Sequence, residues 1–352
     1  MKISINAARI EGPWGGGNRF VANLERYLTT CGHQVYRRLV PNLDLILLVA
    51  VQPQLRISSY APAEARAYRR VYPRCSLVLR VNTCDEQRGA DVGINRQVRR
   101  VAEAADHTVF VSQFMRGLFT AQGLPESGAL SVIPTGADGR LFHPQGGAEY
   151  RRGTRFRLVT HHWSTGIMKG YDIYERLDAL LATEPYAGQF EFTHIGRVPL
   201  GLALPNSRVL PVLEGAELAD ELRTHHAHIT GARFEPGGNH YIEAMQCGLP
   251  VLYLRSGGTP EYCAGYGCEF TPITFERVLQ QFPAQYAQRR RAVLEYGYDA
   301  DRMSARYLEL FQSLVNARQQ QTSRASVSQA IAGSVQLAAK SIRRTFRRRR
   351  AS

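Results

Sequence analysis

The sequence predicts an α/β protein built from two domains, each with a parallel sheet. Three observations favour this class. Short apolar segments alternate with segments of helical periodicity, the alternation occurs twice, and a segment rich in glycine at 141–155 separates the two halves. The chain has 352 residues, enough for two full cores, and its 44% hydrophobic and 21% charged residues are ordinary for a globular protein.

The first half is expected to begin with a strand over 2–10, followed by a glycine loop over 12–20. Apolar residues then recur at helical spacing between Phe20 and Leu28, which predicts a helix over 20–30. Apolar segments predict the remaining strands at 31–40, 43–51, 75–82, 107–112 and 129–136.

The second half repeats the alternation. Strands are predicted at 155–163, 190–196, 207–213, 226–234 and 250–255, and helices at 171–182, 216–224, 240–248 and 302–314. We therefore expect two Rossmann-like domains, 1–150 and 151–316 with a closing helix, that face a cleft. Ligands of such sheets bind at the carboxyl ends of the strands.

The tail, 317–352, differs in composition and charge. The net charge is +14, and seven positive charges without an acid lie between Lys340 and Ser352, which leaves +7 for the rest. Apolar residues from Val327 to Phe346 recur at steps of three and four, as in a helix lying on a membrane surface. A disordered basic tail is the alternative. No nucleic-acid partner is expected, since aromatic residues for base stacking are not interleaved.

The remaining compositional features predict a cytoplasmic protein, with peripheral contact to the membrane through the tail. The first ten residues lack the pattern of a signal peptide, and the longest apolar run, 45–51, is too short to span a bilayer. The six cysteines show no C-x-x-C pair or zinc-like spacing, so buried free thiols in a reducing compartment are expected.

Two glutamates flank a glycine turn before the predicted helix at 240–248. Glu235 and Glu243 are separated by seven residues, and Pro-Gly-Gly follows the first of them. Glycine allows a sharp turn, and Asn239 is suited to cap the helix. A helix amino terminus attracts diphosphate, whereas carboxylates accept hydrogen bonds from sugar hydroxyls. This combination predicts a site for a nucleotide diphosphate sugar.

The segment 235–261 resembles the E-x7-E signature of retaining glycosyltransferases of the GT-B fold, family 4-like. The glutamate pair is followed by AMQCGLPVLY and SGGTPE. Other segments resemble the family in order along 1–316: GGGNRFVANLERYLTTCGHQVY, ADHTVFVSQFMRGLF, SVIPTGADGRLFHP and MKGYDIYERLDALL. Five ordered segments make the resemblance specific. It implies an acceptor-side amino-terminal domain and a carboxyl-terminal domain that binds the nucleotide sugar.

The resemblance also implies roles for individual residues. Glu243 matches the glutamate that binds the ribose hydroxyls of the donor, Glu235 the one that contacts the donor sugar, and Lys169 the lysine that pairs with the donor phosphates. Glu261 falls where the family places another acidic residue near the nucleotide. Further matched positions lie on the donor side and in the loop that approaches the phosphate and the acceptor: Gly237, Gly238, Asn239, Gly15, Gly16, Gly17 and Asn18.

Two positions depart from the family. Ser164 stands where an arginine usually precedes the phosphate lysine by five residues, and Arg197 is a candidate to supply the missing charge from a neighbouring strand. The usual amino-domain histidine near the reaction centre has no match, and 80–89 occupies its place. Candidates on the acceptor side in this segment are Arg80, Asn82, Asp85 and Arg88.

No metal or cofactor is expected. Asp299 and Asp301 form a D-x-D sequence, which chelates a metal in other glycosyltransferases, but here Asp301 is suited to cap the following helix. Lys169 and a helix amino terminus can stabilise the leaving diphosphate instead. The histidines at 225, 226 and 228 fit no familiar metal spacing and lead into a predicted strand.

Two functions of different class follow. The first is a hexosyl transferase that moves a sugar from a nucleotide diphosphate sugar to a carbohydrate or lipid-linked acceptor, with retention by same-face attack. The alternative is a catalytically degenerate GT-B protein that binds an anionic partner. Glu235, Glu243 and Lys169 together favour the first, because a binding relic does not need all three.

Overall fold

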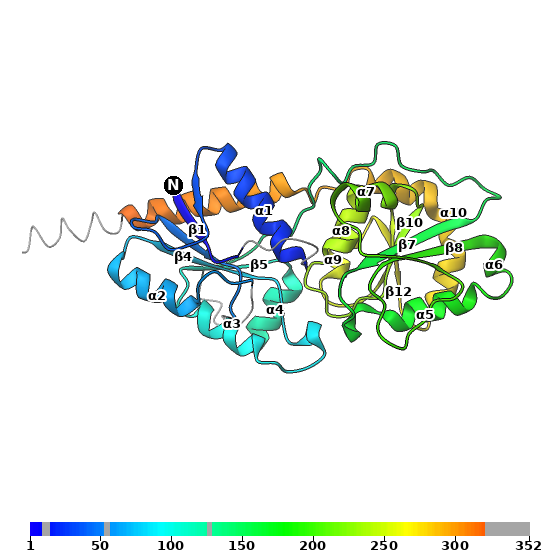
Figure 1. Cartoon of the computed structure of the whole chain (residues 1–352), viewed down its shortest axis with the longest axis horizontal. Helices are drawn as coiled ribbons and strands as arrows, with labels where there is room; N and C mark the ends of the chain where they lie inside the picture. The colour runs from blue at the N-terminus through cyan, green and yellow to red at the C-terminus, as the bar shows by residue number, and fades with distance from the viewer. Residues whose placement is uncertain (9–14, 53–56, 125–128, 321–352) are drawn as a thin grey trace, which may run out of the picture.

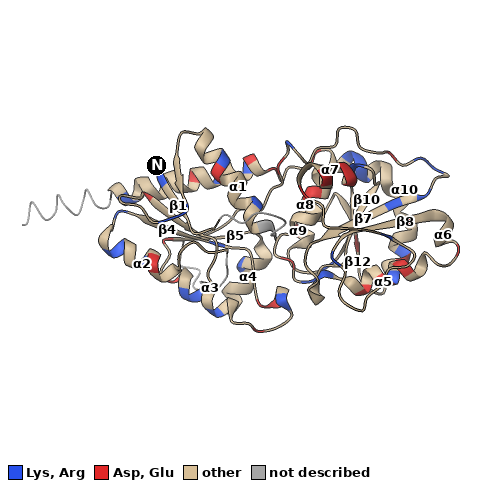
Figure 2. Cartoon of the chain, viewed as in Figure 1, with Lys and Arg blue, Asp and Glu red and all other residues tan. Residues whose placement is uncertain are grey.

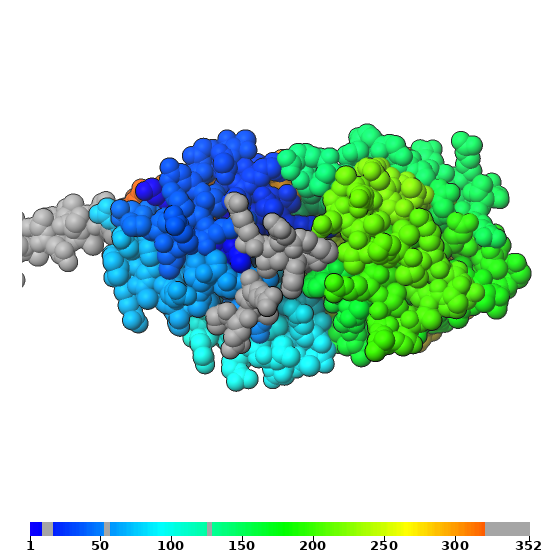
Figure 3. Space-filling view, viewed as in Figure 1, coloured from blue at the N-terminus to red at the C-terminus, as the bar shows by residue number. Residues whose placement is uncertain are grey.

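The computed structural model describes residues 1–8, 15–52, 57–124 and 129–320. Within them the chain forms two domains side by side, each built on a six-stranded parallel sheet flanked by helices (Figure 1). The two domains are in direct contact along the long axis of the molecule (Figure 3). The predicted basic tail from 321 onward lies outside the described residues.

The amino-terminal sheet has the strand order β2-β1-β3-β4-β5-β6. Its strands are β1 (Lys2–Ile5), β2 (Gln34–Tyr36), β3 (Leu45–Leu48), β4 (Ser76–Val81), β5 (His107–Phe110) and β6 (Leu130–Val132). The helices of this half are α1 (Gly15–Thr30), α2 (Pro62–Val71), η1 (Glu86–Arg88), α3 (Ile94–Ala102) and α4 (Gln113–Ala121). Strands β3 and β4 are buried along their whole length, because helices cover both faces of a parallel sheet.

The carboxyl-terminal sheet has the order β12-β11-β10-β7-β8-β9. Its strands are β7 (Phe156–His162), β8 (Phe190–Gly196), β9 (Arg208–Leu210), β10 (Ala227–Thr230), β11 (Val251–Leu254) and β12 (Gly267–Phe270). The accompanying helices are η2 (Ile167–Lys169), α5 (Tyr171–Leu180), α6 (Tyr186–Gln189), α7 (Gly215–Arg223), α8 (Asn239–Gln246), α9 (Thr259–Cys263) and α10 (Phe275–Val293). Strands β7 and β10 are neighbours, so the segments that follow them emerge at one edge of the sheet.

The last described helix, residues 300–320, returns to the amino-terminal domain (orange in Figure 1). Met303, Tyr307 and Phe311 are buried in one core cluster with Ile3 and Phe20. The prediction that the closing helix belongs to the carboxyl-terminal domain is therefore wrong. Its apolar face completes the core beside β1 and α1, which ties the end of the chain to its beginning.

The structure confirms the alternation of strands and helices but changes several boundaries. The glycines at 15–17 and Asn18 begin α1, so the predicted loop over 12–20 is helical from Gly15 onward. Strand β10 ends at Thr230, and Glu235 lies in the loop beyond it rather than at the strand's end. The sequence did not indicate α2, α3, α4, α6, α9, α10 or β12.

The structure shows where the cysteines and the charged side chains lie. Four cysteines are buried as expected, but Cys31 is exposed and Cys268 is half-buried. Basic and acidic side chains are interspersed over both domains rather than gathered on one of them (Figure 2). Within residues 1–8, 15–52, 57–124 and 129–320, no helix combines the length and apolar character needed to cross a membrane.

Candidate active site at the domain interface

The predicted glutamate loop lies between β10 and α8, at the carboxyl edge of the sheet. The backbone N–H of Gly258 donates to the carbonyl of Glu235 at 2.8 Å, so the second glycine pair holds the loop in place. A Cβ on Gly257, whose φ is +59°, would lie 2.6 Å from the backbone nitrogen of Glu235. Only glycine permits this close approach, which explains the Gly-Gly sequence after β11.

Glu235 is held from both domains. Lys169 Nζ lies 2.6 Å from Glu235 Oε2, and the two side chains are 20% and 7% exposed. Lys169 is the last residue of η2, directly after β7, so two adjacent strands bring the pair together. Gln87, in η1 of the amino-terminal domain, donates from Nε2 to Glu235 Oε1 at 2.9 Å. The sequence prediction missed Gln87, because nothing in its local pattern shows that it reaches the other domain.

Glu243 lies in α8 with only 3% of its side chain exposed. Arg19 of α1 pairs with its Oε1 from the amino-terminal domain, and His161 Nε2 at the end of β7 lies 3.1 Å from its Oε2. Burial alone would raise the pKa of the Glu243 carboxyl, but Arg19 and His161 hold this pKa below its ordinary value. Glu243 is therefore an ionised acceptor at neutral pH. Neither Arg19 nor His161 was predicted.

The amino terminus of α8 lies between these two glutamates. Gly238 rather than Asn239 occupies the cap position, so the predicted capping role of Asn239 is wrong. The Gly238 N–H donates to the Tyr241 hydroxyl at 2.6 Å. A Cβ on Gly237 would lie 2.6 Å from the Tyr262 hydroxyl oxygen. The glycine pair thus lets a packed turn deliver a helix amino terminus to the site.

Glu261 contacts the amino-terminal domain, and its predicted place beside the nucleotide stays a prediction. Its two carboxylate oxygens accept from the backbone N–H groups of Gln113 and Phe114, each at 2.6 Å. It therefore caps the amino terminus of α4 across the domain interface. The adjacent Tyr262 accepts from the Thr135 N–H at 3.0 Å, which adds a second contact between the domains. Both residues position the two domains.

The acceptor-side candidates of 80–89 divide into two kinds. Arg80 is 3% exposed, with its guanidinium carbon 3.8 Å from the centre of the Phe20 ring, so its prediction as an acceptor-side residue is wrong. Asp85 is also buried, and its carboxylate accepts from the backbone N–H groups of 92, 94 and 95. Asn82 is half-buried and Arg88 is exposed. The last two stay predictions.

Ser164, which stands where the family has an arginine, lies in a segment next to Arg197. The Tyr171 hydroxyl contacts the carbonyl oxygens of Ser164 and Arg197 at 2.9 and 2.8 Å, so the two backbones are neighbours. Arg197 is exposed at the end of β8. It remains a candidate for a contact with the donor.

The two aspartates of the D-x-D sequence lie at the start of the last described helix. Asp299, not Asp301, provides the cap: its Oδ1 accepts from the N–H groups of Asp301 and Arg302 at 2.7 and 3.1 Å. Asp301 pairs with Arg26 of α1. The prediction that Asp301 caps the helix is wrong by two residues, because the helix begins at Ala300.

A group of buried histidines lies beneath the site. The rings of His162 and His240 are 4.6 Å apart, and His228 and His240 are 5.6 Å apart. His225 and His226 precede β10 at the opposite end of the sheet, where His225 contacts the Thr193 hydroxyl and the His226 ring accepts from the Arg157 N–H. Among the described residues, no group of three or more His, Cys, Asp or Glu side chains has the geometry of a metal site.

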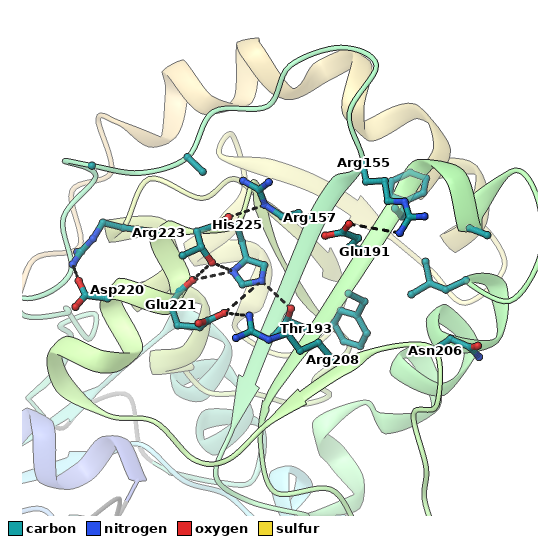
Figure 4. A pocket seen from close by; sticks show the side chains of 17 residues that line it. Arg155, Arg157, Glu191, Thr193, Asn206, Arg208, Asp220, Glu221, Arg223 and His225 are labelled. Atoms are coloured by element: carbon teal, nitrogen blue, oxygen red, sulfur yellow. Dashed lines mark hydrogen bonds and ion pairs between the residues drawn. The ribbon is translucent and has the colours of Figure 1, made fainter.

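A separate cavity of about 860 Å³ lies at the other end of the carboxyl-terminal sheet (Figure 4). Its lining includes the first residues of β7, β8 and β9, and none of the residues predicted to bind the donor. Arg208 pairs with Glu221 at 2.6 Å, and Arg155 with Glu191 at 3.7 Å. Because ligands of parallel sheets bind at the carboxyl ends of strands, the domain interface rather than this cavity is the candidate active site.

The two-domain architecture is the GT-B fold, as comparison with solved structures shows. Sucrose-phosphate synthase from Thermosynechococcus elongatus matches with a TM-score of 0.66 and 16% identity over 90% of this chain and 99% of that chain. HepE from Anabaena, in complex with UDP-glucose, matches with a TM-score of 0.65 and 17% identity over 89% and 100%. A glycosyltransferase from Rickettsia africae ESF-5 gives 0.64 and 12% over 89% and 98%.

Among curated proteins, the chain is similar to a GDP-mannose-dependent alpha-(1-6)-phosphatidylinositol monomannoside mannosyltransferase from Mycolicibacterium smegmatis. The two are 29% identical over 191 residues, 47% of this chain and 48% of that protein. The chain thus matches about half the length of this relative. No protein-family model matches the chain.

Proposed function

We propose that the protein is a glycosyltransferase that takes a hexose from a nucleotide diphosphate sugar. The observation that carries the proposal is the convergence of Glu235, Glu243 and Lys169 at one edge of a parallel sheet, beside the amino terminus of α8. Carboxylates accept from hydroxyls, whereas a lysine and a helix terminus attract phosphate. The relatives' names include donors of this class, UDP-glucose and GDP-mannose.

In the proposed reaction, the bond between the anomeric carbon and the diphosphate oxygen breaks, and the acceptor oxygen bonds to the same carbon. The acceptor's proton leaves with the diphosphate. Lys169 and the first N–H groups of α8 stabilise the charge that develops on the leaving group. Glu235 orients the sugar and Glu243 the ribose, so the chain acts mainly by positioning.

We further propose that configuration is retained and that no metal takes part. Glu235 is engaged by Lys169 and Gln87, an arrangement that suits binding hydroxyls better than acting as a nucleophile. Asp299 and Asp301 are committed to the cap and to Arg26. The acceptor is a carbohydrate or a lipid-linked sugar on the amino-terminal side, where Asn82 and Arg88 remain candidates.

The test is a donor screen with the full chain. UDP, GDP and ADP sugars are incubated with simple glycoside acceptors, and nucleotide release and product configuration are measured. We expect release from at least one donor, with an α-linked donor yielding an α-linked product. Binding of nucleotide sugars without any release would favour the degenerate binding protein instead.

A further inference from the structure

The ionic pairing at the domain interface has a specific pattern. Each of the two site glutamates is paired with one cation, Lys169 with Glu235 and Arg19 with Glu243. Lys169 comes from the same domain as both glutamates, whereas Arg19 comes from α1 of the other domain, whose first turns approach α8 and α9 (Figure 1). The site without a ligand is therefore neutralised by its own side chains.

A nucleotide diphosphate sugar offers the opposite set of partners. Its diphosphate is anionic and pairs with cations, whereas its ribose and sugar hydroxyls donate to carboxylates. Both internal ion pairs can then be exchanged for contacts with the donor. The exchange leaves no buried charge unpaired, which matters because Glu243 is only 3% exposed and an uncompensated charge there is costly.

We propose that Arg19 is a diphosphate-binding residue. When the donor binds, its ribose hydroxyls take the place of Arg19 at Glu243, and the Arg19 side chain turns to the donor phosphates. This inference rests on the proposed function. It assigns to an arginine of the amino-terminal domain the charge that is missing at Ser164.

Arg19 fits this role better than Arg197 does. It already contacts a site carboxylate, and its side chain is 35% exposed, so it has room to turn toward a ligand. Its guanidinium can bind phosphate oxygens with two N–H groups at once. A diphosphate held by Lys169 and Arg19 would also join the two domains, in place of the Arg19–Glu243 pair that joins them in the free protein.

The test compares four chains: wild type, Arg19→Ala, Arg19→Ala with Ser164→Arg, and Arg26→Ala. Arg26 lies on the same helix and pairs with Asp301, so its variant controls for loss of an α1 ion pair. Calorimetry measures binding of UDP, GDP and ADP and of the three corresponding nucleosides. Thermal melting confirms that each variant is folded, and Arg19→Lys serves as a milder substitution if Arg19→Ala is not.

We expect Arg19→Ala to weaken binding of the nucleoside diphosphate by about 10–100-fold and to leave nucleoside binding unchanged or tighter, since Glu243 is freed. Ser164→Arg in the same chain should recover at least tenfold of the loss, and Arg26→Ala should behave like wild type. Equal weakening of nucleoside and nucleoside diphosphate, or no recovery with Ser164→Arg, would overturn the role of Arg19. If wild type binds none of the three diphosphates, the proposed function itself fails.

Discussion

Gln87 of the amino-terminal domain donates a hydrogen bond to Glu235 of the carboxyl-terminal domain, at 2.9 Å. The same carboxylate carries the ion pair with Lys169 on its other oxygen. Glu235 is thus oriented by one residue from each domain, and its geometry depends on how the domains meet.

This relationship predicts that Gln87→Ala lowers kcat with little effect on donor binding. The loss should be about tenfold, because one hydrogen bond to a charged group is removed while the Lys169 pair remains. Steady-state kinetics with the donor found in the screen measures the change. Gln280→Ala is a matched control, since Gln280 donates to the Tyr186 hydroxyl on α6, away from the site. An unchanged kcat would show that Gln87 does not orient Glu235.

Replacement of Lys169 or Glu243 by alanine should abolish most transfer at subsaturating donor in a folded protein. Lys169→Ala removes the side-chain charge that stabilises the leaving group, for which a loss of about 10²–10³ in kcat is expected. Glu243→Ala removes an ionised acceptor and should chiefly raise the KM for the donor. Turnover and melting temperature are measured together. Glu276→Ala, which removes an exposed pair with Arg176, is the control. Near-normal turnover in both site variants would remove these assignments.

Activity is expected to survive chelation. Asp299 caps a helix and Asp301 pairs with Arg26, and the proposed leaving-group contacts are made by Lys169 and α8. Nucleotide release is assayed in EDTA and again after adding back Mn²⁺ or Mg²⁺. Loss of turnover in EDTA that a metal restores would mean that the leaving group is stabilised by a cation from solution.

Stability is expected to fall as the pH drops from about 6.5 toward 4. Burial lowers the pKa of His194, His225 and His226 to about 4 in the folded protein, whereas an unfolded histidine titrates near 6.5. The unfolded state therefore binds more protons in this window, and the stability present above it is lost on acidification. Urea unfolding at pH 7.5, 6, 5 and 4 measures the trend.

His194→Leu should flatten part of this decline. Both ring nitrogens of His194 are buried without a hydrogen-bond partner among the described residues. Leucine at this position removes an imidazole whose protonated form is unfavourable in the folded protein. The variant is compared with wild type at the same pH values. A parallel decline in both chains would assign the acid sensitivity to other groups.

The basic tail is expected to bring the chain to anionic membranes. Seven positive charges from Lys340 onward would each contribute about 1 kcal/mol near an anionic leaflet. Co-sedimentation with anionic and neutral liposomes compares the full chain with a chain ending at Gln320. More full chain than shortened chain should sediment with anionic vesicles only. Equal sedimentation of the two would leave the tail without a membrane role.

The sequence by itself determined the alternation of strands and helices, the two halves and the glutamate loop. These features are local: apolar periodicity specifies strands and helices, and Pro-Gly-Gly specifies a turn wherever it occurs. Glu235 and Glu243 were identified from their spacing and from a family resemblance, and Lys169 from the resemblance alone. The structure brings all three to one edge of one sheet.

The tertiary structure alone decided which residues meet these three. Arg19 and Gln87 reach the glutamates from the other domain, and Glu261 caps a helix there instead of standing free. Residues 300–320 likewise join the first domain although they follow the second. Such contacts join residues that are 148 or 224 positions apart, and they depend on how two preformed domains pack. Local periodicity carries no information about that packing.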